Sequence, residues 1–378
     1  MKKITYSKQS ISDQDIRSVI QVMKGDFLTQ GPKVVAFEKK FANYIGSKYA
    51  VSVSNGTAAL HLSAIALGVN KNSKVITSPI TFTATANSIH YCDGKIEFCD
   101  IDPETLCLDI EMVKNKLKTS PKGTYQGIIP VNFAGYPLDL QEYRALADKY
   151  GLWILEDSCH SPGGFFTDSN GINQKCGNGN FADLAIFSFH PVKHIACGEG
   201  GMITTNSKFY YDKLLMLRSH SIDRNSNEKQ GWFYDIENLG YNYRMPDILC
   251  ALGISQLDLA NNKLEKRRLI ASRYISAFKN TSIKVPFSNN HKGHAYHLFV
   301  IEIDNRLELY NFLRKNNIFC QVHYIPLHTS KYYIRKYGKK VFPCAENYYD
   351  KCLSLPMYPG LKLEEQEFVI EKILSFYE

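Results

Sequence analysis

Four stretches of the sequence carry residues whose types and spacing could do chemistry. The first surrounds a lysine, Lys193, in the run Phe187-Ser-Phe-His-Pro-Val-Lys-His-Ile-Ala-Cys-Gly-Glu-Gly-Gly201. This lysine lies between an apolar segment and a glycine-rich return, which predicts an amine held where a strand gives way to a cavity. Because a lysine on a loop is ordinarily a solvated charge, its role must be judged from the other three stretches.

The second stretch, Ser54-Asn-Gly-Thr-Ala-Ala59, follows a predicted strand and opens a predicted helix. Small side chains let the backbone come close to a ligand, and the free amides and dipole at a helix start favour an anion. The stretch is therefore a candidate phosphate cradle, although it is not a Walker A loop. The alternative is an ordinary strand-to-helix turn capped by Asn55.

The third stretch, Leu155-Glu-Asp-Ser-Cys-His160, ends a very apolar predicted strand with two acids and a histidine. Functional groups of α/β enzymes lie at the carboxyl ends of strands, and burial there perturbs their protonation. A metal site is the competing interpretation. Because only one histidine lies close by and no second carboxylate cluster follows, we predict no metal.

The fourth stretch, Gly177-Asn-Gly-Asn-Phe-Ala182, matches the Gly-x-Gly-x-x-Ala pattern of dinucleotide sites. It precedes a predicted strand instead of following one, and it opens no helix. The structural context that such a site requires is missing, so we discard this interpretation.

The first three stretches together hold the parts that a pyridoxal phosphate (PLP) site needs. A lysine that forms a Schiff base with PLP requires an acid paired to the pyridine nitrogen, a phosphate cradle and a lining that covers the ring. The acid keeps that nitrogen protonated, so that the ring can accept the electrons left when a proton departs from the substrate carbon. Asp157 precedes Lys193 in the chain, and the cradle lies at an earlier strand end.

Short apolar segments alternate with helical patterns from about residue 47 to residue 205, and this alternation sets the expected fold. The predicted strands cover residues 49–53, 74–77, 95–99, 127–131, 152–155, 183–189 and 201–205. The predicted helices between them cover residues 58–67, 83–91, 110–117 and 139–150. The alternation predicts a mainly parallel sheet with helices on both faces and ligands at the carboxyl ends of its strands.

Two domains are expected from the length of 378 residues and from a change of pattern after the alternating region. Residues 1–250 are predicted to form an N-terminal arm and a large α/β domain, and residues 251–378 a smaller α+β domain. Within the smaller domain, strands are expected at 297–303 and 319–324 and helices at 306–316 and 364–376. A polar, irregular loop is predicted at 221–232.

The composition is that of an ordinary globular chain, with 44% hydrophobic and 22% charged residues. The amino terminus turns polar at once and no apolar run reaches the length of a membrane span, so a cytoplasmic protein is expected. The ten cysteines include no Cys-x-x-Cys pair and are predicted to be reduced core residues. A net charge of +8 favours an anionic partner: nucleic acid, a membrane surface or a phosphorylated small molecule.

Seven motifs, in this order, resemble those of the DegT/DnrJ/StrS-type sugar-nucleotide aminotransferases, which have the aspartate aminotransferase fold (fold type I). The motifs are Leu28-Thr-Gln-Gly31, Asn55-Gly-Thr-Ala-Ala-Leu60, Thr81-Phe-Thr-Ala-Thr85, Glu156-Asp157 with His160, Phe187-Ser-Phe-His-Pro-Val-Lys193, Gly198-Glu-Gly-Gly201 and Gly240-Tyr-Asn-Tyr-Arg244. The resemblance covers essentially the whole chain. It implies a PLP-dependent transferase with a mainly parallel central sheet and a smaller C-terminal α+β domain.

The resemblance also implies residue roles at the matching positions. Lys193 would carry the cofactor and move a proton in the reaction, while Asp157 would pair with the ring nitrogen. Phe82 would stack on the ring, and His160 would lie near its phenolic oxygen. The residues implied to hold the phosphate are Gly56, Thr57, Ala58 and Ser188, joined by Asn242 from a partner subunit. That last role implies a homodimer with shared active sites; the alternatives are a core residue for Phe82 and a turn residue for Asn242.

Within the family, four further segments look most like the branch that makes UDP-4-amino-4,6-dideoxy-N-acetyl-L-altrosamine in pseudaminic acid biosynthesis. These segments are Phe189-His-Pro-Val-Lys-His-Ile195, Arg218-Ser-His-Ser-Ile222, Gly253-Ile-Ser-Gln-Leu257 and Gln321-Val-His-Tyr-Ile-Pro326. The resemblance implies glutamate as the amino donor and UDP-2-acetamido-2,6-dideoxy-L-arabino-hex-4-ulose as the acceptor. An enzyme for another nucleotide-linked 4-keto-6-deoxy sugar is the alternative.

Aromatic and neutral polar groups suit a uracil and a sugar. The candidates for substrate contact are Tyr6, Thr29, His190, His323 and Tyr324, with surface or interdomain packing as the alternative. Outside the enzyme class, a regulatory DNA-binding protein on the same fold stays open, since the chain is basic. No additional helix-turn-helix pattern occurs outside the two expected domains, so neither nucleic acid nor a membrane is the predicted partner.

Overall fold

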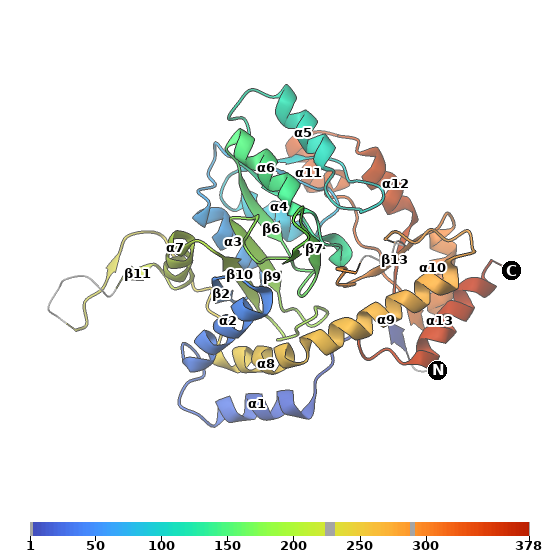
Figure 1. The fold of residues 1–378 in the computed structure, drawn as a ribbon, viewed down its shortest axis with the longest axis horizontal. Coiled ribbons are helices and arrows are strands. Elements are labelled where there is room, and N and C mark those ends of the chain that lie inside the picture. Colours follow the sequence, from blue (N-terminus) through green and yellow to red (C-terminus); the bar gives the residue numbers. More distant parts are fainter. Residues whose placement is uncertain (1–2, 224–230, 288–291, 378) are drawn as a thin grey trace.

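The computed structural model describes residues 3–223, 231–287 and 292–377, and a seven-stranded sheet lies at its centre (Figure 1). In spatial order, the strands are β2 (Tyr49–Val53), β10 (Gly201–Thr205), β9 (Leu184–Ser188), β6 (Trp153–Asp157), β5 (Gly127–Ile129), β3 (Lys74–Thr77) and β4 (Lys95–Phe98). β10 runs antiparallel to both neighbours, and the other pairs are parallel. The predicted, mainly parallel sheet is confirmed.

Helices cover both faces of this sheet, because successive side chains of a strand point to opposite sides. Ile76 of β3 packs with two helices on one face, α5 (Ile110–Thr119) and α6 (Leu140–Tyr150). Its neighbour Val75 packs in a separate core cluster on the opposite face. The helices of that cluster are α3 (Gly56–Ala66), α4 (Thr83–His90) and α7 (Lys208–Arg218).

A smaller sheet lies in the C-terminal part of the chain, where β13 (Phe299–Glu302) pairs antiparallel with β15 (Cys352–Leu355). The helices in its core cluster are α9 (Ala260–Phe278), α10 (Arg306–Lys315) and α13 (Leu363–Ser375). Arg267 of α9 is buried, and its guanidinium donates hydrogen bonds to the carbonyl oxygens of Tyr296, His297 and Met357. These bonds join α9 to the C-terminal part.

The predicted strand at 319–324 is wrong for most of its length. Only β14 (Ile318–Phe319) is a strand there, and it pairs in parallel with β1 (Ile4–Thr5) of the N-terminal arm. The chain then forms one backbone pair, between Gln321 and Ser354, before it turns toward the large sheet. The sequence pattern does not predict β15, since four residues are too few to show a period.

The remaining elements frame these two sheets. They are α1 (Asp13–Met23), α2 (Pro32–Ile45), η1 (Phe133–Gly135), β7 (Phe165–Thr167), β8 (Asn173–Lys175), β11 (Ile222–Asp223), β12 (Asp235–Ile236), α8 (Asp247–Asp258), η2 (Leu327–Thr329), α11 (Lys331–Tyr337) and α12 (Pro343–Lys351). Helix α8 packs against α1 and α2, and it contains residue 250, so the predicted domain boundary falls within a helix and stays a prediction.

The segment that contains β11 projects from the body of the molecule beside α7 (Figure 1). The predicted irregular loop at 221–232 falls here, and its residues 224–230 lie outside the described residues. Ile222 and Asp223 do not belong to a loop, because they pair with Ile236 and Asp235 in an antiparallel strand pair. Within the described residues, no helix is long and apolar enough to cross a membrane.

Two leucines on opposite faces of α10 test the core of the C-terminal part. Leu309 is fully buried, whereas 65% of the Leu307 surface is exposed. We expect Leu309→Ala to lower the free energy of unfolding by about 2 to 5 kcal/mol, because it removes buried apolar contacts and leaves a cavity. The matched control, Leu307→Ala, is expected to change it by about 0.5 kcal/mol or less. Denaturant unfolding followed by circular dichroism measures both; equal effects would contradict the packing of α10.

Candidate functional site

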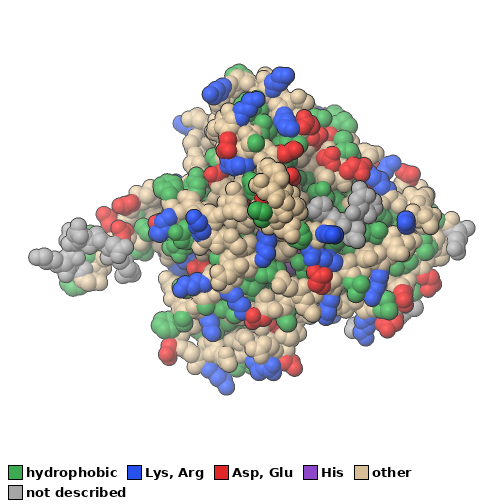
Figure 2. All heavy atoms as spheres, in the orientation of Figure 1, with side chains coloured by type: hydrophobic (Ala, Val, Ile, Leu, Met, Phe, Trp, Pro, Cys, Tyr) green, Lys and Arg blue, Asp and Glu red, His purple; other side chains and the backbone are tan. Residues whose placement is uncertain are grey.

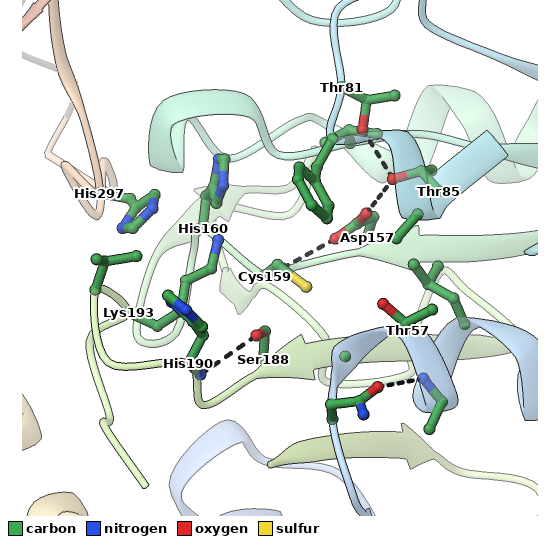
Figure 3. Close-up of a pocket in the computed structure, with 18 of the residues that line it drawn as sticks. Thr57, Thr81, Thr85, Asp157, Cys159, His160, Ser188, His190, Lys193 and His297 are labelled. Carbon is green, nitrogen blue, oxygen red and sulfur yellow. Dashed lines mark hydrogen bonds between the residues drawn. The ribbon is translucent and has the colours of Figure 1, made fainter. Parts of the chain in front are cut away.

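A cavity of about 660 Å³ opens at the carboxyl ends of the central strands. The large sheet contributes residues that follow β2 and β3 and residues at the ends of β6 and β9 (Figure 3). The C-terminal part contributes His297, His323 and Tyr324, and the N-terminal arm contributes Tyr6. The structure therefore brings the three chemical stretches of the sequence to one place.

Lys193 lies on the loop after β9, in a turn closed by a hydrogen bond from its backbone N–H to the carbonyl oxygen of His190 (2.8 Å). Its side chain reaches into the same space as Asp157 and His160 (Figure 3). Burial lowers the pKa of the Lys193 amine from its usual 10.5, because an ammonium group loses its water there. The neutral amine, which can act as a nucleophile or a base, is therefore more accessible than on a surface lysine.

Asp157 is the last residue of β6, and its carboxylate borders the cavity. Its Oδ2 accepts a hydrogen bond from the hydroxyl of Thr85 on α4 (2.7 Å). Its Oδ1 accepts one from the backbone N–H of Cys159 (3.1 Å). Both carboxylate oxygens are thus held by groups of the protein.

The neighbouring acid, Glu156, points to the other side of β6 and is not part of the cavity lining. It accepts hydrogen bonds from the Asn132 amide (2.7 Å), the Ser158 hydroxyl (2.7 Å) and the backbone N–H of Gly177 (2.9 Å). Burial raises the pKa of Glu156. Strand alternation therefore places one of the two adjacent acids in the cavity and the other in the core.

Helix α3 starts at the cavity, where Oδ1 of Asn55 accepts a hydrogen bond from the backbone N–H of Ala58 (2.8 Å). The helix begins at Gly56, earlier than predicted, because Asn55 is its cap. The amides of Gly56 and Thr57 have no acceptor within the helix, and both residues border the cavity. A Cβ atom on Gly56 would lie 3.0 Å from the Cβ atom of Ser188, so a glycine permits this close approach. Capping by Asn55 and an open cradle are therefore compatible.

Aromatic side chains line part of the cavity. Phe82 precedes α4 and keeps 56% of its surface exposed, which argues against a simple core role. Its ring centroid lies 6.1 Å from that of Tyr324. Nε2 of His160 lies 3.3 Å from the Tyr324 hydroxyl, while Nδ1 of His160 has no hydrogen-bond partner among the described residues. Burial lowers the pKa of His160 well below its usual 6.5, so this imidazole is neutral near pH 7.

Four of the five residues predicted to contact substrate line the cavity, namely Tyr6, His190, His323 and Tyr324. The ring centroids of Tyr6 and His323 lie 5.1 Å apart. Nδ1 of His323 lies 2.9 Å from the Ser354 hydroxyl, and burial lowers the pKa of this histidine to about 3. The His323 imidazole therefore offers the cavity a polar group that is uncharged near pH 7.

Two predicted site residues, Thr29 and Asn242, lie outside the cavity lining and are exposed. Asn242 forms an isolated backbone pair with Ser219, beside the projecting segment. A single chain does not bring these two residues to Lys193.

Among the cavity residues that were not predicted as site residues, Thr85, Cys159 and His297 contact Asp157 or His160. The ring centroid of His297 lies 4.2 Å from that of His160, a contact between distant parts of the chain that no local spacing reveals. For Thr85 the sequence does contain a signal, because this residue lies one helical turn after Thr81 at the start of a helix.

The described residues contain no group of three histidine, cysteine, aspartate or glutamate side chains that could hold a metal ion. All ten cysteines are free thiols, and seven of them are buried. The seven buried cysteines agree with the prediction of reduced core residues, whereas Cys92, Cys159 and Cys344 are only partly buried.

Residues 9–374 of the chain match the DegT/DnrJ/EryC1/StrS aminotransferase family. The chain is 36% identical to the spore coat polysaccharide biosynthesis protein SpsC of Bacillus subtilis, over 98% of this chain and 96% of the relative. It is also 36% identical to the UDP-4-amino-4,6-dideoxy-N-acetyl-beta-L-altrosamine transaminase of Campylobacter jejuni, over 99% of this chain and 98% of the relative.

Solved structures share the whole fold. PseC from Helicobacter pylori, an aminotransferase of pseudaminic acid biosynthesis, matches with a TM-score of 0.90 and 28% identity over 99% of both chains. Spr1654 from Streptococcus pneumoniae, solved in its PLP form, matches with a TM-score of 0.88 and 25% identity over 100% of this chain and 99% of that one. The expected aminotransferase fold is confirmed. From the family match over nearly its whole length and the two relatives above 30% identity, the chain belongs to the DegT/DnrJ/EryC1/StrS aminotransferase family.

Proposed function

We propose that this aminotransferase uses PLP to transfer the amino group of glutamate to the C4 keto group of UDP-2-acetamido-2,6-dideoxy-L-arabino-hex-4-ulose. The product is UDP-4-amino-4,6-dideoxy-N-acetyl-L-altrosamine, an intermediate of pseudaminic acid biosynthesis. One observation carries the chemical part of the proposal: the Lys193 amine, the Asp157 carboxylate and the open amides of Gly56 and Thr57 border the same cavity.

The residues around the cavity fit PLP. The amides and small side chains of Gly56, Thr57 and Ala58 suit its phosphate, together with the Ser188 hydroxyl, because a helix start favours an anion. The Asp157 carboxylate suits the protonated ring nitrogen, and the exposed face of Phe82 suits the ring. His160 has a buried Nδ1 without a partner among the described residues, which leaves a polar atom available for a ligand.

Bound PLP supplies an electron sink that makes the proton on the carbon next to the substrate nitrogen removable. The chain supplies the group that moves this proton. Lys193 Nζ takes it up and returns it, acting first as a base and then as an acid. The lowered pKa of Lys193 suits both roles, because a base and acid is most effective when its pKa approaches the working pH.

The part of the cavity lined by Tyr6, His190, His323 and Tyr324 suits the nucleotide sugar. Its aromatic surfaces and uncharged imidazole match a uracil and a sugar that carry no cationic group. The names of the Campylobacter jejuni relative and of PseC support the choice of the altrosamine branch.

A second candidate acceptor is another nucleotide-linked 4-keto-6-deoxy sugar. The equal identity to SpsC, a protein of spore coat polysaccharide biosynthesis, favours this alternative. Both candidates use the same proposed cofactor site and differ only in the sugar. A DNA-binding role has less support, because Lys and Arg side chains are interspersed with Asp and Glu on the face shown in Figure 2.

We further propose a homodimer in which Asn242 reaches the cofactor phosphate of the partner. The exposed position of Asn242 supports this arrangement, and so do large apolar side chains that one chain leaves exposed. Those near the projecting segment include Trp232, Tyr234, Ile236 and Leu239. Large apolar side chains that are exposed close together in one segment are typical of an interface.

The substrate proposal is tested with purified protein, glutamate and the two C5-epimeric UDP-linked 4-keto sugars, with L-arabino and D-xylo configurations. We expect the L-arabino ketone to be aminated preferentially, as followed by chromatography and mass spectrometry. Lys193→Ala is expected to lower the rate by about a hundredfold or more, because the proton-moving amine is lost. Lys122→Ala, at an exposed lysine, is the control. Turnover of the D-xylo ketone alone would refute the acceptor, and an active Lys193→Ala enzyme would refute the mechanism.

Mixed dimers test the role of Asn242. The Lys193→Ala and Asn242→Ala homodimers are each expected to be impaired at both sites. A mixed dimer regains one complete site, because the Asn242→Ala chain retains Lys193 and its partner retains Asn242. After equal mixing and subunit exchange, about one quarter of the wild-type activity is expected. No recovery, despite exchange shown by native mass spectrometry, would place Asn242 in its own chain's site.

The lowered pKa of Lys193 predicts a pH-dependent stability difference in the cofactor-free protein. The pKa of this amine is lower in the folded state than the 10.5 of the unfolded chain. At low pH the amine is charged in both states, and the whole cost of burying the ammonium then lowers the stability of the fold. The penalty disappears as the pH rises toward 10.5. Lys193→Met should therefore be more stable than the wild type near pH 7, with the difference in melting temperature shrinking toward pH 10. A difference that does not change with pH would contradict the shift.

A further inference from the structure

A chain of two hydroxyl groups ends on the Asp157 carboxylate. Oγ1 of Thr81 lies 2.8 Å from Oγ1 of Thr85, and Oγ1 of Thr85 lies 2.7 Å from Oδ2 of Asp157 (Figure 3). All three side chains are nearly fully buried, with 1%, 0% and 5% of their surfaces exposed. Water therefore has little access to these groups and cannot easily replace either hydrogen bond.

The direction of donation along this chain follows from the chemistry of its end. An ionised carboxylate only accepts hydrogen bonds, so Thr85 must donate its single hydroxyl proton to Asp157. Thr85 can then only accept from Thr81, which must donate. Each hydroxyl group is thereby held in one orientation. Because the Thr85 hydroxyl accepts a hydrogen bond from Thr81, it is polarised and donates more strongly to Asp157.

The carboxylate of Asp157 is held from two sides. Oδ1 accepts from the Cys159 backbone N–H at 3.1 Å, while Oδ2 accepts from Thr85. Two donors on different oxygens fix the plane of the group and leave its remaining lone pairs to face the cavity. The same helix start that carries Thr85 also follows directly on Phe82, so one element orients both the ring-facing side chain and the acid.

We propose that Thr85 is a positioning residue of the reaction: its hydroxyl, oriented by Thr81, holds the Asp157 carboxylate in line for the ring nitrogen of PLP. This inference rests on the proposed cofactor. Thr85 itself acts through Asp157 and touches no reacting atom.

The test compares proteins stripped of cofactor and titrated with PLP. Thr85→Val keeps the shape of the side chain and removes the hydroxyl, which is expected to weaken PLP retention about 10- to 100-fold, as for loss of a hydrogen bond to a charged group. The pH at which the visible absorption band of the bound cofactor changes is expected to shift as well. Thr85→Ser keeps the hydroxyl and should restore both properties toward the wild type.

Thr77→Val is the matched control. Thr77 is likewise fully buried in the large sheet, and its hydroxyl donates to the carbonyl oxygen of Ile129 (2.8 Å), away from Asp157. It should retain PLP as the wild type does and show the same absorption change with pH. Thr81→Val, which removes the outer donor, should shift both properties in the direction of Thr85→Val by a smaller factor.

Three outcomes would overturn the inference: a Thr85→Val protein like the wild type, a Thr85→Ser protein like Thr85→Val, or a Thr77→Val protein with the same defect. If Thr85→Val does not fold, the Thr81→Val protein is the test. An unchanged absorption profile of that protein would refute the proposed role of the Thr81 and Thr85 hydroxyl groups. A wild-type protein that binds no PLP would instead refute the proposed function and this inference with it. The two failures are therefore distinguishable.

Discussion

The parallel pairing of β6 between β5 and β9 is the constraint on which the site depends. Asp157 lies opposite Ile186 in β9, and its backbone N–H donates to the carbonyl oxygen of Pro130 after β5. This register ends the strands at one edge, within reach of the Lys193 loop. A slip of one residue would turn Asp157 into the core and Glu156 into the cavity, since side chains alternate along a strand. Backbone hydrogen bonds thus select the acid that can meet a cofactor.

Burial gives the cavity its electrostatic character. The pKa values of Lys193, His160 and His323 are all lowered, chiefly because the cavity walls remove water from their charged forms. The His160 and His323 imidazoles are therefore neutral near pH 7. The N-terminal arm completes this enclosure, because the Tyr6 carbonyl oxygen accepts a hydrogen bond from the Met357 backbone N–H (2.9 Å).

Much of this arrangement can be predicted from sequence, because local rules govern it. Alternating short apolar strands and helical segments predict the seven-stranded sheet, and parallel strands require their carboxyl ends to share an edge. That rule alone places Asp157, Ser188 and the Gly56 turn near one another. The order of the motifs identifies the family. Segments without a clear period are predicted poorly, as at 319–324, where pairing with the N-terminal arm and with β15 decides the conformation.

The sequence by itself therefore determined the sheet, the residues at its functional edge and the lysine among them. Only the tertiary structure decided several of the contacts around that lysine. His297 and Tyr324 come from the C-terminal part, and Thr85 meets Asp157 across two separate elements. These contacts join residues far apart in the chain, so no spacing encodes them. Burial, and with it the lowered pKa of the Lys193 amine, exists only once all of these elements have packed together.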